Sequence, residues 1–217
     1  LSIRRQRQMC IRDRIIGQLW LANFSEKSNK PITNVVFMGM GEPLLNFDNV
    51  IEATKIIKDQ NAYGLSRKRI TISTSGIVPN IKELNKHVDV SLAISLHAAN
   101  DDLRDKIVPI NKKYPIKMLL SSCIDFLADH DSKRHITIEY ILIKDINDSY
   151  EDAKSLVSLL STFPCKINLI PFNKFEGSDY ERSSNKRINN FKKYLIEKGF
   201  ITTLRTTCLL YTSDAAD

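Results

Sequence analysis

Short apolar runs alternate with segments of helical spacing along most of the chain, and this alternation constrains the fold more than any other feature. Six runs rich in Val, Ile, Leu and Phe have the apolar content of buried strands, within residues 34–40, 68–76, 88–98, 134–143, 165–173 and 200–207. Helical spacing predicts helices within residues 15–24, 46–60, 80–87, 115–130, 148–163 and 184–199. Strands separated by helices favour parallel pairing with crossover helices. We therefore predict an α/β fold, and both an open doubly wound sheet and a partial (β/α) barrel fit the pattern.

The composition is that of a globular protein rather than a membrane or secreted one. With 217 residues, 42% hydrophobic and 26% charged, the chain is long enough for one domain with a core. No apolar run approaches the roughly 18 residues of a membrane span, and no apolar segment follows the first arginines as in a secretion signal. The four cysteines lack metal-ligand spacing, which is typical of reduced thiols. We expect a single-domain cytoplasmic protein. Its net charge of +7 permits a polyanionic partner without requiring one.

Small and polar residues collect where the predicted strands end. The segments that follow or end five of the strands are residues 39–43, 73–76, 95–101, 139–148 and 171–173, and each of them contains glycine, serine or asparagine. In parallel α/β folds, ligands bind at the carboxyl ends of the strands. The sequence therefore predicts a rim that holds a small polar ligand, largely through backbone contacts.

The individual residues of this rim leave their roles open. Gly41 permits close approach of a ligand or a positive φ, and Glu42 can accept hydrogen bonds from a ligand ammonium group. Alternatively, the two belong to a strand-to-helix turn with a solvated glutamate, and the segment lacks the third glycine of a dinucleotide fingerprint. Two interpretations also stay open for Ser73, His97 and Asn173: each could contact a ligand, or each could form hydrogen bonds within its own turn.

Five longer blocks are more specific than any single residue. They read GMGEPLLNFDNV, RITISTSGIVPNI, LAISLHAANDDLRDKIVPINKKYPI, TIEYILIKDIND and PCKINLIPFNKFEGSDYERSS, in this order. Together they resemble the bacterial dual-specificity radical S-adenosylmethionine (SAM) methyltransferases, which methylate C2 of adenosine in 23S rRNA and in tRNA. The resemblance runs from about Ile15 to Thr207. It implies a radical SAM core domain over residues 15–207 that folds as a partial (β/α) barrel.

The same resemblance implies the cofactors, the partners and seven cofactor-binding residues. The cofactors are SAM and a [4Fe–4S] cluster, and the partners are 23S rRNA, tRNA and an electron donor such as flavodoxin, with the protein a monomer. GMGEP matches the family's GGEP motif. By this match the glycine lets the methionine end of SAM approach, and the glutamate accepts hydrogen bonds from the amino group of SAM. STSG, SLH and the asparagine after LIP match further contacts. The seven residues are Gly41, Glu42, Ser73, Ser95, Leu96, His97 and Asn173.

Two parts of the family's chemistry have no counterpart in the chain. The C-x-x-x-C-x-x-C motif that holds the cluster precedes IIGQ in the family, so we expect it, with the first strand, upstream of Leu1. The cysteine that carries the methyl group falls at Ala216 in the family's register, and Cys208 takes an arginine position. We interpret residues 1–14 and 208–217 as non-native ends of a fragment. We assign no catalytic residue or metal ligand, and expect no methyl transfer from this chain.

Two alternative functions stay open. The paralogous family that methylates C8 of adenosine in 23S rRNA is similar, but GEPLLN, STSG and INLIPFN favour the C2 enzymes. A non-catalytic RNA-binding derivative of the barrel is the other alternative. Its basic segments, residues 66–69, 111–114 and 185–187, could contact phosphates, although each could equally be a solvated loop. Cluster cysteines in the native gene would exclude the RNA-binding derivative.

Overall fold

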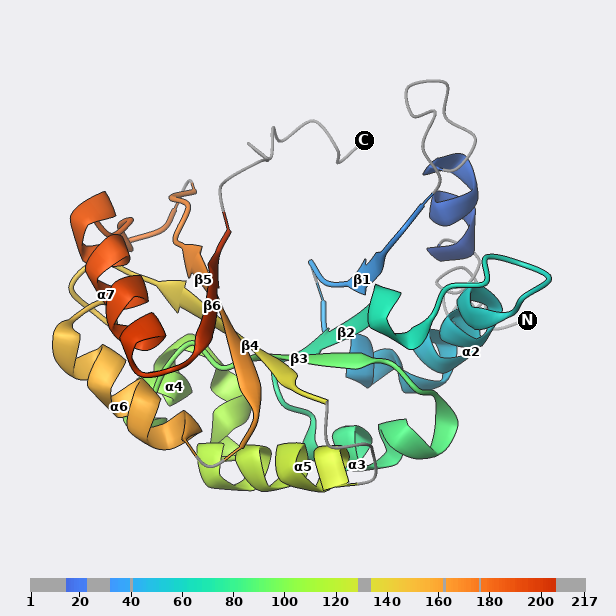
Figure 1. Ribbon diagram of the computed structural model, residues 1–217, viewed down its shortest axis with the longest axis horizontal. Helices are drawn as coiled ribbons and strands as arrows, with labels where there is room; N and C mark the ends of the chain where they lie inside the picture. Colours follow the sequence, from blue (N-terminus) through green and yellow to red (C-terminus); the bar gives the residue numbers. More distant parts are fainter. Residues whose placement is uncertain are drawn as a thin grey trace. The chain divides into compact units, whose positions relative to one another are not determined.

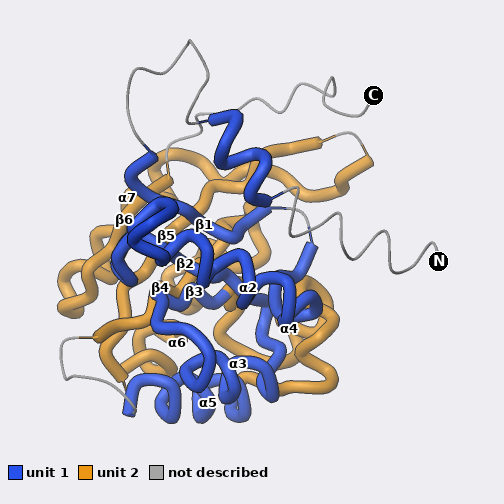
Figure 2. Tube along the Cα trace, turned by 90° about the vertical axis from the view of Figure 1, so that its right-hand side faces the viewer, with its two compact units in different colours: residues 1–94, 117–132 blue, residues 95–116, 133–217 orange. Residues whose placement is uncertain are grey.

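The computed structural model describes residues 15–22, 32–39, 41–128, 134–161, 163–175 and 177–205. The chain forms two compact units, which Figure 2 colours separately. Unit 1 comprises residues 1–94 and 117–132, and unit 2 comprises residues 95–116 and 133–217. The stretches for which we predict a non-native origin, residues 1–14 and 208–217, lie outside the described residues.

Unit 1 is built on three parallel strands, β1 (Val35–Phe37), β2 (Ile70–Thr74) and β3 (Ser91–Ser95). β2 lies between the other two, with Val35 opposite Ile70 and Thr71 opposite Ser91. A helix over residues 15–22 precedes β1. The crossovers contain the short helices η1 (Pro43–Asn46) and η2 (Arg67–Arg69) and the helices α2 (Phe47–Lys58) and α3 (Val78–His87). α5 (Ile116–Ala128) lies beside α3 in Figure 1. The Asn85 amide of α3 donates to the Phe126 carbonyl of α5 at 2.8 Å.

Unit 2 contains the other three strands, β4 (Ile136–Leu142), β5 (Cys165–Pro171) and β6 (Ile201–Leu204). They are again parallel, and β5 lies between β4 and β6. The crossover helices are α6 (Tyr150–Leu160) and α7 (Asn185–Glu197), which lie side by side (Figure 1). The residues that follow β3 form α4 (Asp101–Ile107) and η3 (Pro109–Lys112).

The sequence explains where these elements begin and what they bury. Four alternate side chains of β4, those of Ile136, Ile138, Tyr140 and Leu142, are fully buried, as period-2 alternation requires. The loop after β4 ends in a capping box, in which the Ser149 hydroxyl accepts the Asp152 N–H at 3.1 Å and the Asp152 carboxylate accepts the Ser149 N–H at 3.0 Å. Ser149 is therefore the cap of α6, which begins at Tyr150.

The α/β prediction is confirmed. Each of the six described strands lies inside the segment predicted for it, and consecutive strands within each unit are parallel. The helix α4 is a new feature: at seven residues, five of them charged, it has too little apolar periodicity to be recognised. No helix in the described part of the chain has both the length and the apolar character needed to cross a membrane.

Candidate functional site

The end of β1 is a turn that two glycines make possible. Gly39 has φ +129° and Gly41 has φ +95°, a region that side chains with a Cβ atom rarely adopt. A Cβ atom built on Gly41 meets no described atom within 4 Å. Backbone conformation, rather than crowding, therefore explains the glycine, and among the described residues no side chain fills the space beside it.

Glu42 is bonded within the protein. One carboxylate oxygen, Oε1, accepts the Leu44 N–H at 3.0 Å and so caps η1. The other oxygen, Oε2, accepts the Ser75 N–H at 2.7 Å. The carboxylate thus joins the exit of β1 to the exit of β2. Each carboxylate oxygen has a second lone-pair direction, so the group can still accept from a ligand.

The exit of β2 is organised by hydroxyl groups. Ser73, a predicted cofactor contact, is 6% exposed, and the neighbouring Thr74 is 1% exposed. The Thr74 hydroxyl accepts the Gly76 N–H at 3.0 Å and the Ile77 N–H at 3.4 Å. One hydroxyl of this segment therefore serves its own turn, as the structural alternative from the sequence allowed.

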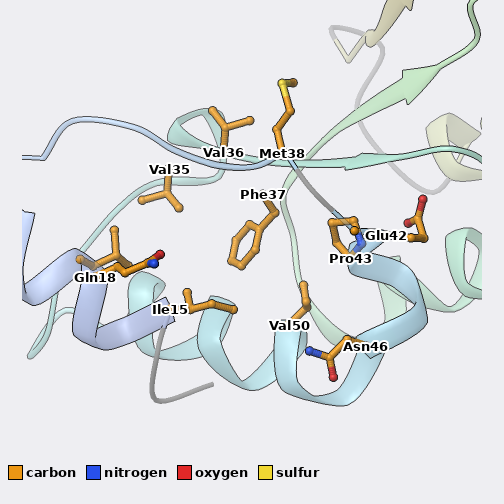
Figure 3. A pocket seen from close by; sticks show the side chains of 12 residues that line it. Ile15, Gln18, Val35, Val36, Phe37, Met38, Glu42, Pro43, Asn46 and Val50 are labelled. Carbon is orange, nitrogen blue, oxygen red and sulfur yellow. The ribbon is translucent and has the colours of Figure 1, made fainter. Parts of the chain in front are cut away.

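A cavity of about 540 Å³ lies next to this turn in unit 1 (Figure 3). In Figure 3 the side chains of Val36 and Met38 lie on the opposite side of β1 from Phe37. Glu42 and Asn46 supply polar groups near the turn, and most of the remaining lining is apolar. The lining comprises Ile15, Gln18, Leu19, Val35, Val36, Phe37, Met38, Gly41, Glu42, Pro43, Asn46 and Val50.

In unit 2, His97 has an unusual backbone and a defined tautomer. Its φ is +62°, which is uncommon for a residue other than glycine. Its Nδ1 atom accepts the Ile141 N–H at 3.2 Å. Burial, followed by the charge of Arg104, lowers the pKa of His97 to about 4, against a smaller upward effect of the hydrogen bond to the Glu139 backbone. The ring is therefore neutral near pH 7, its proton is on Nε2, and Nε2–H can donate to a ligand.

A buried arginine fixes the backbone just before this histidine. Arg104 of α4 is fully buried and donates to the carbonyls of Ser95 and Leu96 at 3.1 and 3.0 Å. It also donates to the Asn111 side-chain oxygen at 2.8 Å, and the Asn111 amide donates to Asp101 at 2.8 Å. The charge thus reaches carboxylates through an amide, which is how a buried cation is tolerated.

The other predicted contacts of unit 2 differ in exposure. The Ser95 hydroxyl donates to the buried Glu139 carboxylate at 3.4 Å. Leu96 is fully buried, and its N–H donates to the Glu139 carbonyl at 3.0 Å. Its backbone N–H and C=O both form hydrogen bonds, so Leu96 helps to hold the backbone conformation at the end of β3. Asn173, two residues beyond β5, is exposed.

Sequence reasoning did not single out Arg104, Asn111 or Asn147. Asn147 is fully buried, and its side-chain amide donates to the carbonyls of His97 and Ile141 at 2.8 and 2.7 Å. The available signal was weak, because these residues stand in charged, polar segments that are typical of solvent-exposed helices and loops.

The described cysteines are not placed for metal binding or nucleophilic chemistry. Cys123 is fully buried in α5, and burial raises the pKa of the Cys165 thiol to about 12. Among the residues described, no group of three or more His, Cys, Asp or Glu side chains could hold a metal ion. Ala216, where we expect the methyl-carrying cysteine of the family, lies outside the described residues.

Comparison with known proteins gives consistent matches. The family model of the radical SAM superfamily matches residues 22–157. Proteins named dual-specificity RNA methyltransferase RlmN, from Pseudomonas putida (strain W619) and Pseudomonas entomophila (strain L48), are each 59% identical over 198 residues. The protein of that name from Pseudomonas fluorescens (strain SBW25) is 57% identical over 198 residues. These matches cover 89% of this chain and 52% of each relative, so the chain spans about half the length of the curated relatives.

Solved structures confirm the predicted fold type. A radical SAM methyltransferase from Sphaerobacter thermophilus matches with a TM-score of 0.82 and 37% identity, over 89% of this chain and 56% of that one. A domain of pyruvate-formate lyase-activating enzyme from Bacteroides vulgatus matches with a TM-score of 0.60 and 20% identity, over 80% of this chain and 99% of that one. The second likeness concerns the fold alone. The predicted partial barrel of the radical SAM type is consistent with both matches.

Proposed function

Because the chain belongs to the radical SAM superfamily, we propose that it is the core of an enzyme that methylates C2 of adenosine in 23S rRNA and tRNA. The observation that carries the proposal is the 57–59% identity over 198 residues with dual-specificity RNA methyltransferases. The choice of C2 rests on the blocks GEPLLN, STSG and INLIPFN. We assign the radical SAM core to residues 15–207.

Membership of this superfamily implies SAM as a cofactor, and the residues of unit 1 fit it. When bound, SAM supplies the methyl group. The open space beside Gly41 lets the ligand approach the backbone. Glu42, already fixed by two backbone N–H groups, retains acceptor capacity for the ammonium group. A carboxylate held in this way loses little side-chain freedom on binding, which favours affinity. We assign Ser73 to a further contact.

In unit 2 we assign Ser95, Leu96, His97 and Asn173 to cofactor binding. His97 supports this assignment most directly, because its neutral ring presents an Nε2–H donor whose direction the Ile141 N–H fixes. Leu96 acts through its backbone position, which Arg104 holds. Asn173 offers an exposed amide with both a donor and an acceptor.

The second cofactor that the superfamily implies, a [4Fe–4S] cluster, does not fit the described residues. They include two cysteines, of which one is fully buried in unit 1 and the other has a pKa of about 12 in unit 2. Cluster binding needs thiolates at close spacing. The four cysteines of the whole sequence lack that spacing, so we propose that these 217 residues alone transfer no methyl group.

A methyl-transfer assay tests the proposal. The chain is completed with the flanking segments of its native gene, loaded with iron and sulfide, reduced by flavodoxin and given isotope-labelled SAM and a 23S rRNA fragment. Nucleoside mass spectrometry then separates 2-methyladenosine from 8-methyladenosine. We expect labelled 2-methyladenosine from the completed protein and no product from the 217-residue chain. 8-Methyladenosine would assign the protein to the paralogous family, and RNA binding without product would favour the non-catalytic derivative.

A further inference from the structure

A second cavity lies wholly within unit 2, at the start of α6 and along α7. Its volume is about 310 Å³. The side chains that matter for its chemistry are Asp148, Tyr150, Arg187, Asn190, Phe191 and Tyr194. None of them is among the predicted cofactor residues. The lining comes from the cap and first turn of α6 and from α7 between Arg187 and Tyr194.

Asp148 gives this cavity an unused acceptor. The residue is 4% exposed, and its Oδ1 atom accepts from the Asp145 N–H at 3.0 Å and from Arg187 at 2.9 Å. Its other oxygen, Oδ2, is buried and has no hydrogen-bond partner among the described residues. A buried carboxylate oxygen without a donor is costly, so a small shift of the side chain that brings Oδ2 to the cavity surface is favoured by a ligand with an N–H or O–H group.

The charge of the site argues for a neutral ligand rather than a cation. Arg187 pairs with both Asp145, at 2.5 Å, and Asp148, so the carboxylate that lines the cavity already has a counter-ion. A second cation would approach the guanidinium as well as the carboxylates. A neutral N–H donor satisfies Oδ2 without that repulsion. The exposed amide of Asn190 adds one donor and one acceptor.

Aromatic rings form the walls. Tyr150, which is 62% exposed, meets Tyr194 edge to face with ring centroids 4.9 Å apart. A T-shaped pair leaves ring faces that the pair itself does not cover. The Phe191 ring stacks on the ring of the buried Tyr140, with the ring centroids 5.5 Å apart. Lys198 lies 5.4 Å from the centre of the Tyr194 ring and supplies a positive charge next to this wall.

We propose that this cavity holds one unpaired base of the RNA substrate, stacked against the tyrosines and donating an N–H to Asp148. Aromatic stacking with a nearby cation is how single-stranded nucleic acids are commonly bound. The inference rests on the proposed function for its choice of RNA. The same loop connects the cavity to His97, because Asn147 donates to the His97 carbonyl at 2.8 Å. A docked base therefore stabilises the loop that holds a candidate cofactor residue.

The test measures binding of fluorescein-labelled octamers to the 217-residue chain by fluorescence anisotropy. The probes are oligoadenylate, an octamer of N6,N6-dimethyladenosine, which keeps the ring system but lacks the amino N–H donors, and an abasic octamer. Tyr150→Ala is expected to weaken oligoadenylate binding by about tenfold. The dimethylated octamer is expected to bind the wild type roughly tenfold more weakly than oligoadenylate. Ile196→Ala is the matched control, since Ile196 is a 50% exposed residue of α7 outside the cavity lining, and its affinity should equal that of the wild type.

Three results would overturn the inference. One is oligoadenylate binding that Tyr150→Ala leaves unchanged, and another is equal affinity for the oligoadenylate and abasic probes. The third is the absence of octamer binding together with saturable binding of spermidine or free arginine in isothermal titration calorimetry, which would identify a cation site. The methyl-transfer assay separates this failure from that of the proposed function. Product formation without octamer binding at the cavity refutes the base site alone, whereas octamer binding without product refutes the proposed methylation alone.

Discussion

At the end of β1, in unit 1, one carboxylate and two glycines organise the chain, whereas after β3, in unit 2, a buried arginine and a buried asparagine do so. Glu42 accepts two backbone N–H groups, one of them only two residues away. His97 keeps φ +62° because Arg104 and Asn147 bond the carbonyls around it. Positive φ is inexpensive for glycine, but for histidine it persists only where the surroundings impose it.

This difference separates two ways of fixing the backbone at the end of a strand. At the exit of β1 the two glycines tolerate the turn, and one of the two hydrogen bonds of Glu42 is local while the other reaches Ser75. The exit of β3 depends on hydrogen bonds from side chains that span 8 to 50 residues in sequence, so it is formed only when unit 2 is folded. Variants in unit 2 should therefore cost more stability than variants in unit 1.

The largest effect is expected for Arg104→Met. Methionine fills much of the volume but leaves the Ser95 and Leu96 carbonyls and the Asn111 amide oxygen without their donor. We expect the free energy of unfolding to fall by about 3–5 kcal/mol, measured by urea denaturation followed by circular dichroism. Lys106→Ala, at an exposed position of the same helix, serves as control. Equal midpoints for the two variants would contradict the role assigned to Arg104.

The second effect is a pH dependence. The folded-state pKa of His97 is about 4, below its usual 6.5, so the unfolded state binds more protons between these values. Stability is therefore fully present above pH 6.5 and is lost as the pH falls toward 4, by up to about 3 kcal/mol. His97→Asn removes the titration while keeping a residue that tolerates positive φ. Its unfolding free energy should lose much less between pH 6.5 and 4 than that of the wild type.

The exposed His87 supplies the control for this titration. His87→Gln should retain the wild-type pH dependence of the unfolding free energy over the same range. If His87→Gln and His97→Asn flattened the curve equally, the dependence would not belong to the buried ring.

The contrast also explains what could be read from the sequence. The strands and most helices follow from apolar periodicity. Glu42 was identified as an acceptor, but its bond to the Ser75 N–H spans 33 residues and has no local signature. Arg104 was missed because DDLRDKI has the composition of a solvated helix. Burial of a charge is decided by partners that lie far away in the chain.

Glu42→Gln should have a smaller effect than either change in unit 2. Glutamine keeps one acceptor oxygen, but its NH₂ group faces a backbone N–H that the carboxylate accepted. We expect a loss of about 2 kcal/mol in the free energy of unfolding, measured by urea denaturation. Glu52→Gln, with the side chain of Glu52 55% exposed, should change stability by less than about 0.5 kcal/mol. A loss of 4 kcal/mol or more for Glu42→Gln would show that changes at the exit of β1 destabilise the protein as much as changes at the exit of β3.

The smallest expected effect comes from a pair of glycines that share open surroundings and differ in backbone. A Cβ atom added at Gly41 or at Gly17 meets no described atom within 4 Å, so neither substitution causes a clash. Gly41 has φ +95°, whereas Gly17 lies in the helix over residues 15–22. Gly41→Ala should therefore lower the free energy of unfolding by about 1 kcal/mol through backbone strain. Gly17→Ala should raise it by about 0.5–1 kcal/mol through helix propensity. Thermal denaturation of the two variants measures the opposite shifts, and a shift of the same sign in both would refute the view that backbone conformation alone requires glycine at the exit of β1.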